Sequence, residues 1–148
     1  MALEKLNKYL SDINIFKFND DTLCKIKEIL SDIKLIDYSD YIKFSDVSYK
    51  KNYVLTNINF DIVIICWKKG QSTRIHDHPD NCCLVKLLEG HLIEEEYNSD
   101  LVLINTNHLE PNQYANKKGK EILHKIIPDV DSISIHIYVP GMYKPNYY

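Results

Sequence analysis

The chain has 148 residues, of which 45% are hydrophobic and 26% are charged, a balance typical of one ordinary globular domain. Its formal net charge of -3 excludes the strongly basic surface of most nucleic-acid-binding domains. No apolar run approaches the roughly 20 residues needed to cross a bilayer, and the N-terminal residues lack the apolar stretch of a signal peptide. We expect a cytoplasmic, monomeric protein that has no nucleic acid or membrane as its partner.

The first third of the chain has helical periodicity. Residues 2–12 place three leucines on one helical face, which predicts a first helix. Asn19 to Asp21 can cap a second helix, because short polar side chains accept hydrogen bonds from the free N–H groups of a first turn. The apolar residues of this second helix are Leu23, Ile26, Leu30 and Ile33. A shorter helical turn is expected between Tyr38 and Phe44.

From residue 52 onward the pattern predicts strands. The expected strands cover residues 53–56, 60–67, 74–78, 83–88, 92–97, 101–105, 121–127 and 132–138. Leu88 to His91 has the composition of a tight hairpin turn between two of them. Many short strands separated by Gly, Pro, Asn and Asp indicate a sandwich or a barrel. We therefore expect a mainly β single domain over residues 1–148, with a helical cover at 1–46 and a β-barrel at 47–148.

Four cysteines are present, and their spacing is unlike that of a disulfide scaffold. We expect all four to be reduced thiols. Cys24 and Cys66 are interpreted as small buried apolar residues. Cys82 and Cys83 are adjacent, so they should point to opposite faces of one strand.

The strongest chemical signal is the segment from Gly70 to Gly90, GQSTRIHDHPDNCCLVKLLEG. His76 and His78 are two residues apart, so in an extended chain both imidazoles point to the same side. Neutral imidazole is a good ligand for iron, nickel, copper or zinc. Arg74 has the same parity and is expected to point inward with them. An isolated pair of this kind is more often a surface accident, but the flanking residues argue against that here.

The flanking residues match the first sequence motif of the cupin fold, in which Gly, His-x-His, an acidic ligand and Gly recur at fixed spacing. The matching residues are Gly70, His76, His78, Cys83 and Gly90. Cys83 therefore replaces the usual glutamate ligand. Lys86 lies on the opposite face of the same strand, and lysine is rarely fully buried. The face that carries Cys83 is therefore expected to point into the barrel.

Two further groups of polar residues lie downstream. His124, in the apolar segment EILHKII, is the natural third ligand, whereas His91 and His108 are expected at the surface. Ser134, His136 and Tyr138 alternate with isoleucines and share one face. This face either lies in water or forms a buried relay, in which Ser134 orients His136 and His136 positions the Tyr138 hydroxyl.

Together these features resemble the cysteine dioxygenase family, from about Tyr49 to Pro140. The segments ICWKKGQSTRIHDHPDNCCLVKLLEGHLIEEEY and SISIHIYVP carry most of the resemblance. It implies a small cupin β-barrel of the jelly-roll type and Fe(II) held by the three histidines. It also implies a thioether between Cys83 and Tyr138, on a strand across the barrel, with Ser134 and His136 supporting the tyrosine. The implied reaction is oxidation of L-cysteine by O2 to cysteine sulfinate.

One departure concerns the substrate. The family pattern Tyr-x-Arg-Asn is here Tyr49-Lys50-Lys51-Asn52. Lys51 keeps the positive charge that grips a substrate carboxylate but loses the two-pronged geometry of arginine. Tyr49, Lys51 and Arg74 are the candidate substrate-binding residues, and the alternative for Lys51 is an ordinary solvated lysine.

Two alternative functions stay open. One is a dioxygenase for another small thiol, such as 3-mercaptopropionate or cysteamine, and the replacement of arginine by Lys51 keeps this alternative alive. The other is a non-catalytic metal-binding cupin. Mere metal binding needs neither Cys83 nor the polar face that ends at Tyr138, which disfavours the second alternative.

Overall fold

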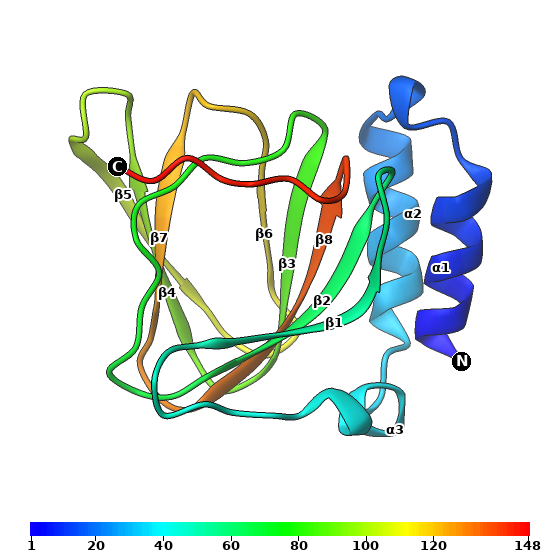
Figure 1. The fold of residues 1–148 in the computed structure, drawn as a ribbon, viewed down its shortest axis with the longest axis horizontal. Coiled ribbons are helices and arrows are strands. Elements are labelled where there is room, and N and C mark those ends of the chain that lie inside the picture. The colour runs from blue at the N-terminus through cyan, green and yellow to red at the C-terminus, as the bar shows by residue number, and fades with distance from the viewer.

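The computed structural model describes residues 1–148, which form helices at the N-terminus followed by eight strands (Figure 1). The helical elements are α1 (Ala2–Asp12), η1 (Ile15–Lys17), α2 (Asp20–Ser31), α3 (Leu35–Tyr38) and η2 (Ser39–Tyr41). The strands are β1 (Lys50–Thr56), β2 (Asp61–Trp67), β3 (Cys82–Glu89), β4 (Leu92–Tyr97), β5 (Leu103–Leu109), β6 (Tyr114–Lys117), β7 (Leu123–Pro128) and β8 (Ser132–Val139).

The strands form two antiparallel sheets that face each other. The larger sheet has the order β1-β2-β8-β3-β6, and the smaller has the order β5-β4-β7. In Figure 1 the two sheets enclose the barrel interior, and α1 and α2 lie against the outside of the larger sheet. The predicted mainly β barrel with N-terminal helices is therefore confirmed.

The larger sheet is buried on both faces, because its outer face carries the helices and its inner face fills the barrel. Alternate side chains of β2, β3 and β8 consequently enter two separate apolar clusters. The outer cluster joins Leu3, Leu6, Leu10, Ile26 and Leu30 of the helices to Ile62, Ile64, Cys82, Leu84, Ile135 and Ile137 of the sheet. The inner cluster includes Val63, Ile65, Trp67, Cys83, Val85, Leu87, Leu92 and Ile126.

Strand β3 shows this division most clearly. Cys82 and Cys83 point to opposite faces as predicted, and Cys83 faces the interior. Lys86, however, is only 2% exposed, so the premise that a lysine here would not be fully buried is wrong, although the conclusion about Cys83 holds. Its Nζ donates a hydrogen bond to the Leu30 carbonyl at the end of α2, at 2.6 Å. The helix thus supplies the acceptor that a buried ammonium needs.

The remaining cysteines are free, as expected, but they differ in burial. Cys66 is buried, whereas Cys24 is exposed, which corrects its interpretation as a core residue. In α2, Asn19 caps the helix by accepting a hydrogen bond from the Thr22 amide at 3.0 Å, as predicted.

Three strand predictions need correction. Residues 74–78 are extended but do not form a regular strand, since only His76 makes a bridge there. Leu88 and Glu89 still belong to β3, and the chain bends at Gly90; because β3 and β4 belong to different sheets, this bend does not close a hairpin. Strand β6 was not predicted, because it has only four residues, YANK, too few to show a clear alternation.

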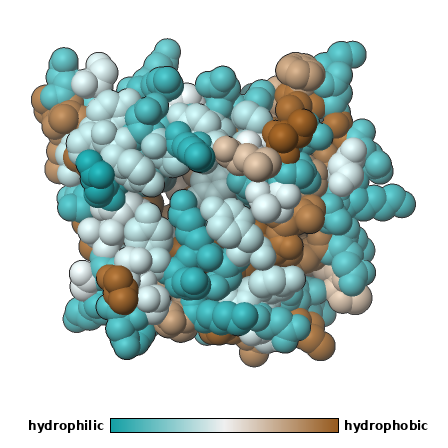
Figure 2. Space-filling model, in the orientation of Figure 1, coloured by the Kyte–Doolittle hydropathy of each residue, from teal (hydrophilic) through white to brown (hydrophobic).

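Exposed apolar residues of the barrel include the consecutive residues Leu101, Val102, Leu103 and Ile104. The side of the molecule shown in Figure 2 is mostly hydrophilic, and brown side chains gather toward the side of the helices. No helix of the structure has the length and apolar character needed to cross a membrane.

Candidate metal centre

The loop between β2 and β3 is held against β7, and this contact assembles the histidine cluster. His76 and His124 exchange two backbone hydrogen bonds, of 3.0 and 3.1 Å. Thr73 exchanges two more with Ile126, one through its amide at 3.0 Å and one through its hydroxyl at 2.9 Å. An extended backbone pinned in this way turns His76 and His78 to the same side, although it is not a regular strand.

The three predicted histidines form one cluster. The nearest ring nitrogens of His76, His78 and His124 all lie within 4.8 Å of one another. His78 and His124 are buried and His76 is half-buried. Burial lowers the pKa of all three, and with the neighbouring imidazoles it lowers the pKa of His78 to about 2. At neutral pH the cluster is therefore uncharged, which is the state that binds metals.

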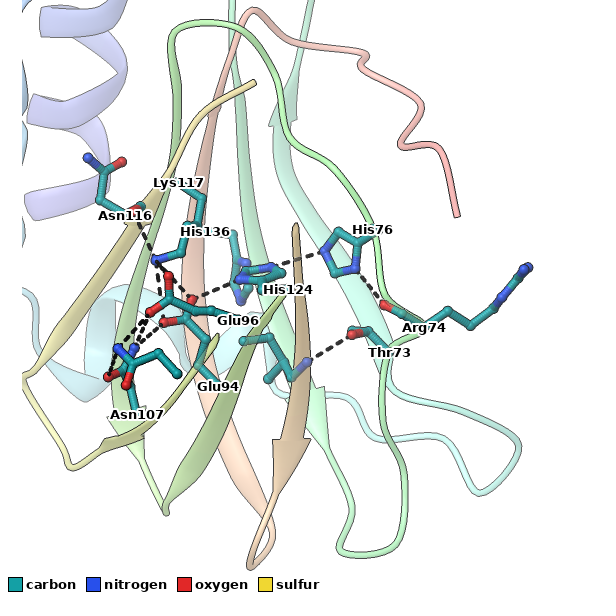
Figure 3. A network of polar contacts seen from close by, with 12 residues as sticks. Thr73, Arg74, His76, Glu94, Glu96, Asn107, Asn116, Lys117, His124 and His136 are labelled. Atoms are coloured by element: carbon teal, nitrogen blue, oxygen red, sulfur yellow. Dashed lines mark hydrogen bonds and ion pairs between the residues drawn. The ribbon is translucent and has the colours of Figure 1, made fainter. Parts of the chain in front are cut away.

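The hydrogen bonds of the cluster fix which nitrogens carry protons. Nδ1 of His76 donates to the Arg74 carbonyl at 2.7 Å, and Nδ1 of His124 donates to Oε2 of Glu94 at 2.8 Å (Figure 3). In each neutral ring Nε2 is then unprotonated. These two Nε2 atoms face each other at 3.1 Å. Neither ring nitrogen of His78 has a hydrogen-bond partner.

Unprotonated ring nitrogens that face one another without a donor between them are costly unless a cation lies there. The residues present therefore fit a divalent transition metal, which accepts neutral imidazole nitrogens as ligands. No carboxylate shares this cluster, because Cys83 occupies the place of the usual acidic ligand.

Glu94 supports His124 from behind and was not predicted from the sequence. Glu94 is 1% exposed. Nζ of Lys117 lies 3.4 Å from Glu94 Oε2 and 3.3 Å from Glu96 Oε2, and Asn107 donates to Glu94 Oε1 at 3.1 Å. Figure 3 shows this group on the far side of His124 from His76. The alternation of β4 could have indicated its burial, because Glu94 lies two residues after buried Leu92 and therefore points to the same face.

The polar face of β8, formed by Ser134, His136 and Tyr138, lies inside the barrel and not in water. Its side chains form a chain of hydrogen bonds, as the relay alternative expects. The indole of Trp67 donates to Ser134 Oγ at 2.9 Å, and Ser134 lies 2.7 Å from His136 Nε2. Since indole N–H can only donate, the serine hydroxyl accepts from it and donates to Nε2. His136 Nδ1 then carries a proton and donates to the Tyr138 oxygen at 3.2 Å. Trp67 was missed by the sequence reasoning.

Cys83 and Tyr138 are direct neighbours. They are paired residues of the adjacent strands β3 and β8, which corrects the expected position across the barrel. Both line the same cavity. Burial raises the pKa of the Cys83 thiol and that of the Tyr138 phenol well above their ordinary values.

A single cavity contains the histidine cluster and most of the other predicted site residues. It is lined by His76, His78, His124, Cys83, His136, Tyr138, Tyr49 and Lys51, among others. Tyr49 stacks on Trp67 with ring centroids 4.9 Å apart. His91 and His108 lie outside this cavity and stack on each other, with His108 exposed as expected and His91 half-buried.

Arg74 does not enter the cavity, so the prediction that it points inward is wrong. Its side chain is exposed, and Figure 3 shows it extending away from His124. The guanidinium lies 5.0 Å from the centre of the Tyr147 ring. A guanidinium without a buried acidic partner stays in water, which overrides the parity of the extended chain.

The family model described as cysteine dioxygenase type I matches residues 14–148. The chain belongs to this family. Cysteine dioxygenase type 1 from Rattus norvegicus and from Homo sapiens are each 30% identical to it over 114 residues, covering 70% of this chain. The chain spans only 57% of the length of these cysteine dioxygenases.

Solved structures show the same fold. A double-stranded β-helix protein from Klebsiella pneumoniae superposes with a TM-score of 0.64 at 19% identity, covering 79% of this chain and 91% of that one. A cupin superfamily protein from Desulfitobacterium hafniense superposes with a TM-score of 0.56 at 12% identity, covering 66% and 83%. The expected cupin fold is therefore confirmed for this cysteine dioxygenase family member.

Proposed function

We propose that this protein is an iron-dependent thiol dioxygenase that oxidises a small thiol bearing a carboxylate, foremost L-cysteine, to its sulfinate. The observation that carries the proposal is the pair of unprotonated Nε2 atoms of His76 and His124, which face each other at 3.1 Å. With His78 they open onto the cavity that holds Cys83 and Tyr138. Membership of the cysteine dioxygenase family makes ferrous iron the metal to expect in this cluster.

His76, His78 and His124 would hold the iron, and bound there it would supply activation of O2 for transfer to sulfur. Three neutral ligands add no negative charge to the ion, which favours an anionic thiolate beside it. The overall reaction adds both oxygen atoms of O2 to the thiol sulfur and gives a sulfinic acid. The protein contributes binding, orientation and exclusion of water.

Lys51 would bind the substrate carboxylate. Its ammonium is half-buried in the cavity wall, and burial lowers its pKa. It forms no ion pair or hydrogen bond with the protein, and its Nζ lies 6.0 Å from the centre of the Tyr138 ring. An unpaired cation in this position favours an anionic substrate, which disfavours cysteamine because that thiol carries a cation instead.

Tyr138 would donate a hydrogen bond into the cavity. Its oxygen accepts a hydrogen bond from His136, so its own O–H proton is free to point elsewhere. Because burial keeps the phenol protonated at neutral pH, Tyr138 can donate to an anionic group of the substrate or to oxygen. Ser134 and Trp67 hold His136 in the required tautomer. A thioether between Cys83 and Tyr138 would fix the phenol in one rotamer.

The test is oxygen consumption by the iron-loaded protein with L-cysteine, 3-mercaptopropionate and cysteamine, with mass spectrometry of the products. We expect uptake with L-cysteine and formation of its sulfinate, and loss of both in His124→Ala. Uptake with 3-mercaptopropionate alone would reassign the substrate. Iron bound at one ion per chain without uptake on any thiol would overturn the proposal in favour of a non-catalytic metal-binding cupin.

A further inference from the structure

The segment after β8, residues 141–148, runs across the open end of the barrel and is called here the roof segment (Figure 1). Three of its side chains line the cavity: Tyr143, Pro145 and Tyr147. The roof segment therefore lines the same cavity that contains the histidine cluster. None of these residues was singled out by the sequence reasoning.

The beginning of the roof segment is fixed to the turn between β1 and β2. The Gly141 amide donates to the Ile58 carbonyl at 3.2 Å, and the Met142 amide donates to Asp61 Oδ2 at 2.9 Å. A Cβ at Gly141 would lie 1.9 Å from the Asn57 carbonyl oxygen, so only glycine allows this close approach.

The far end is fixed by Asp77, the residue between two of the clustered histidines. Because the backbone is extended there, the Asp77 side chain points away from the rings of His76 and His78. It is 1% exposed. Its carboxylate accepts hydrogen bonds from the Tyr143 hydroxyl at 2.7 Å, from the Asn146 amide at 2.9 Å and side chain at 2.8 Å, and from the Tyr148 hydroxyl at 3.3 Å.

Backbone pairing then sets the position of Tyr147. The Asp77 amide donates to the Asn146 carbonyl at 3.2 Å, and the Tyr148 amide donates to the Ile75 carbonyl at 3.0 Å. Tyr147 is thereby paired with His76, with ring centroids 6.2 Å apart. The exposed guanidinium of Arg74 lies against the Tyr147 ring, a cation–π contact that holds the ring in place.

Tyr147 also marks the boundary between the inside and the outside. Tyr49, Lys51 and Tyr147 line the cavity, and the same three residues line a shallow external depression that includes Arg74. The cavity offers about 40 Å³ to the centres of water molecules. A space of this size suits a compound of few heavy atoms.

We propose that Tyr147 is a specificity-determining residue, placed by the roof segment to limit how far a thiol can extend from the histidine cluster past Lys51. The inference rests on the proposed thiol dioxygenase function and adds a limit on substrate length. A two- or three-carbon mercapto acid ends at Lys51, whereas a longer one meets the Tyr147 ring. Arg74 acts through Tyr147 and is a positioning residue.

The test measures binding rather than turnover, on protein loaded with Co(II). Mercaptoacetate, 3-mercaptopropionate, 4-mercaptobutyrate and 6-mercaptohexanoate are titrated, and dissociation constants are taken from the change in Co(II) absorption. We expect the wild type to bind the longest acid at least about tenfold more weakly than 3-mercaptopropionate. Tyr147→Ala should remove most of this preference, because binding of the longest acid should be strengthened much more than binding of 3-mercaptopropionate.

Tyr148→Phe is the matched control, because it removes one hydroxyl contact to Asp77 from the neighbouring position and leaves Tyr147 in place. It should keep the wild-type preference. An unchanged preference in Tyr147→Ala, or an equal loss of preference in both variants, would overturn the role of Tyr147 while the thiol function stands. Absence of any thiol binding in the wild type would instead overturn the proposed function, and the inference with it.

Discussion

Glu94→Gln is expected to weaken metal binding without unfolding the protein. The wild-type carboxylate accepts the Nδ1 proton of His124 at 2.8 Å, which leaves Nε2 free toward the cluster. A glutamine of the same shape loses the negative charge. Its amide oxygen will also prefer the Oε1 position, where Asn107 donates. The NH2 group then faces His124 and favours the tautomer in which Nε2 is protonated and cannot bind a metal.

The size of the effect follows from the burial and length of this contact. The carboxylate of a residue that is 1% exposed, lying 2.8 Å from its donor, makes a charge-assisted hydrogen bond, which is stronger than a neutral one. When a metal-binding histidine loses a hydrogen-bond partner of this kind, the metal affinity typically falls 10–100-fold. We therefore expect the dissociation constant for Fe(II) or Co(II) to rise by roughly 10–100-fold, equivalent to about 1.4–2.8 kcal/mol.

The assay is titration of metal-free protein under anaerobic conditions in competition with a chelator of known affinity. Glu96→Gln is the control, because the Glu96 carboxylate pairs with the same Lys117 at 3.3 Å. Glu96 lies opposite His124 in the β4–β7 ladder, but its carboxylate forms no hydrogen bond or ion pair with the imidazole. Thermal unfolding of the metal-free variants checks that both remain folded. Equal affinities for Glu94→Gln and wild type, or equal losses in the two variants, would refute the role assigned to the bond between Glu94 and His124.

Lys51→Ala should raise KM for L-cysteine roughly 10–100-fold in steady-state assays. Because burial lowers the pKa of Lys51, the wild-type enzyme should lose this charge, and its KM should increase, at a pH below the ordinary lysine pKa of 10.5. Lys51→Arg, which stays charged, should abolish this increase. After aerobic turnover, peptide mass spectrometry should find Cys83 and Tyr138 in one reductant-resistant pair lighter by two hydrogens; separate, unmodified peptides would exclude the thioether. Gly90→Ala should destabilise the fold by about 1–3 kcal/mol in thermal melts, because φ is +98° and its Cβ would lie 2.2 Å from Ser132 Oγ, whereas Gly70→Ala, at φ +94° with nothing within 4 Å, should cost less.

Local patterns predicted much of the histidine cluster even where the secondary structure was wrong. His76 and His78 share one side because any extended backbone alternates its side chains, whether or not it pairs as a strand. The same rule failed for Arg74, whose position depends on hydration and on the Tyr147 ring, a contact between residues far apart in the sequence. Alternation along an extended chain therefore determines on which side of the backbone a side chain starts, but it does not determine where the end of a long side chain lies.

The polar support of the cluster could not be read from local sequence. Glu94, Lys117 and His124 lie on three different strands, and each would be an implausible buried residue by itself. Their charges and hydrogen bonds compensate one another only after β4, β6 and β7 come together. The same holds for Lys86, whose acceptor is a helix carbonyl 56 residues away.

The two-faced burial of β3 and β8 separates two kinds of mutational sensitivity along the same short strands. Changes at Cys83 or Tyr138 alter the cavity, whereas changes at their neighbours Cys82 or Ile137 alter how the helices dock. Substitutions at the outward positions of these strands can therefore change thermal stability while the inward positions, and with them the cavity, stay the same. Among related sequences, substitutions in the helices should then co-vary with substitutions at the outward residues of these strands. Neither should co-vary with substitutions around the cavity.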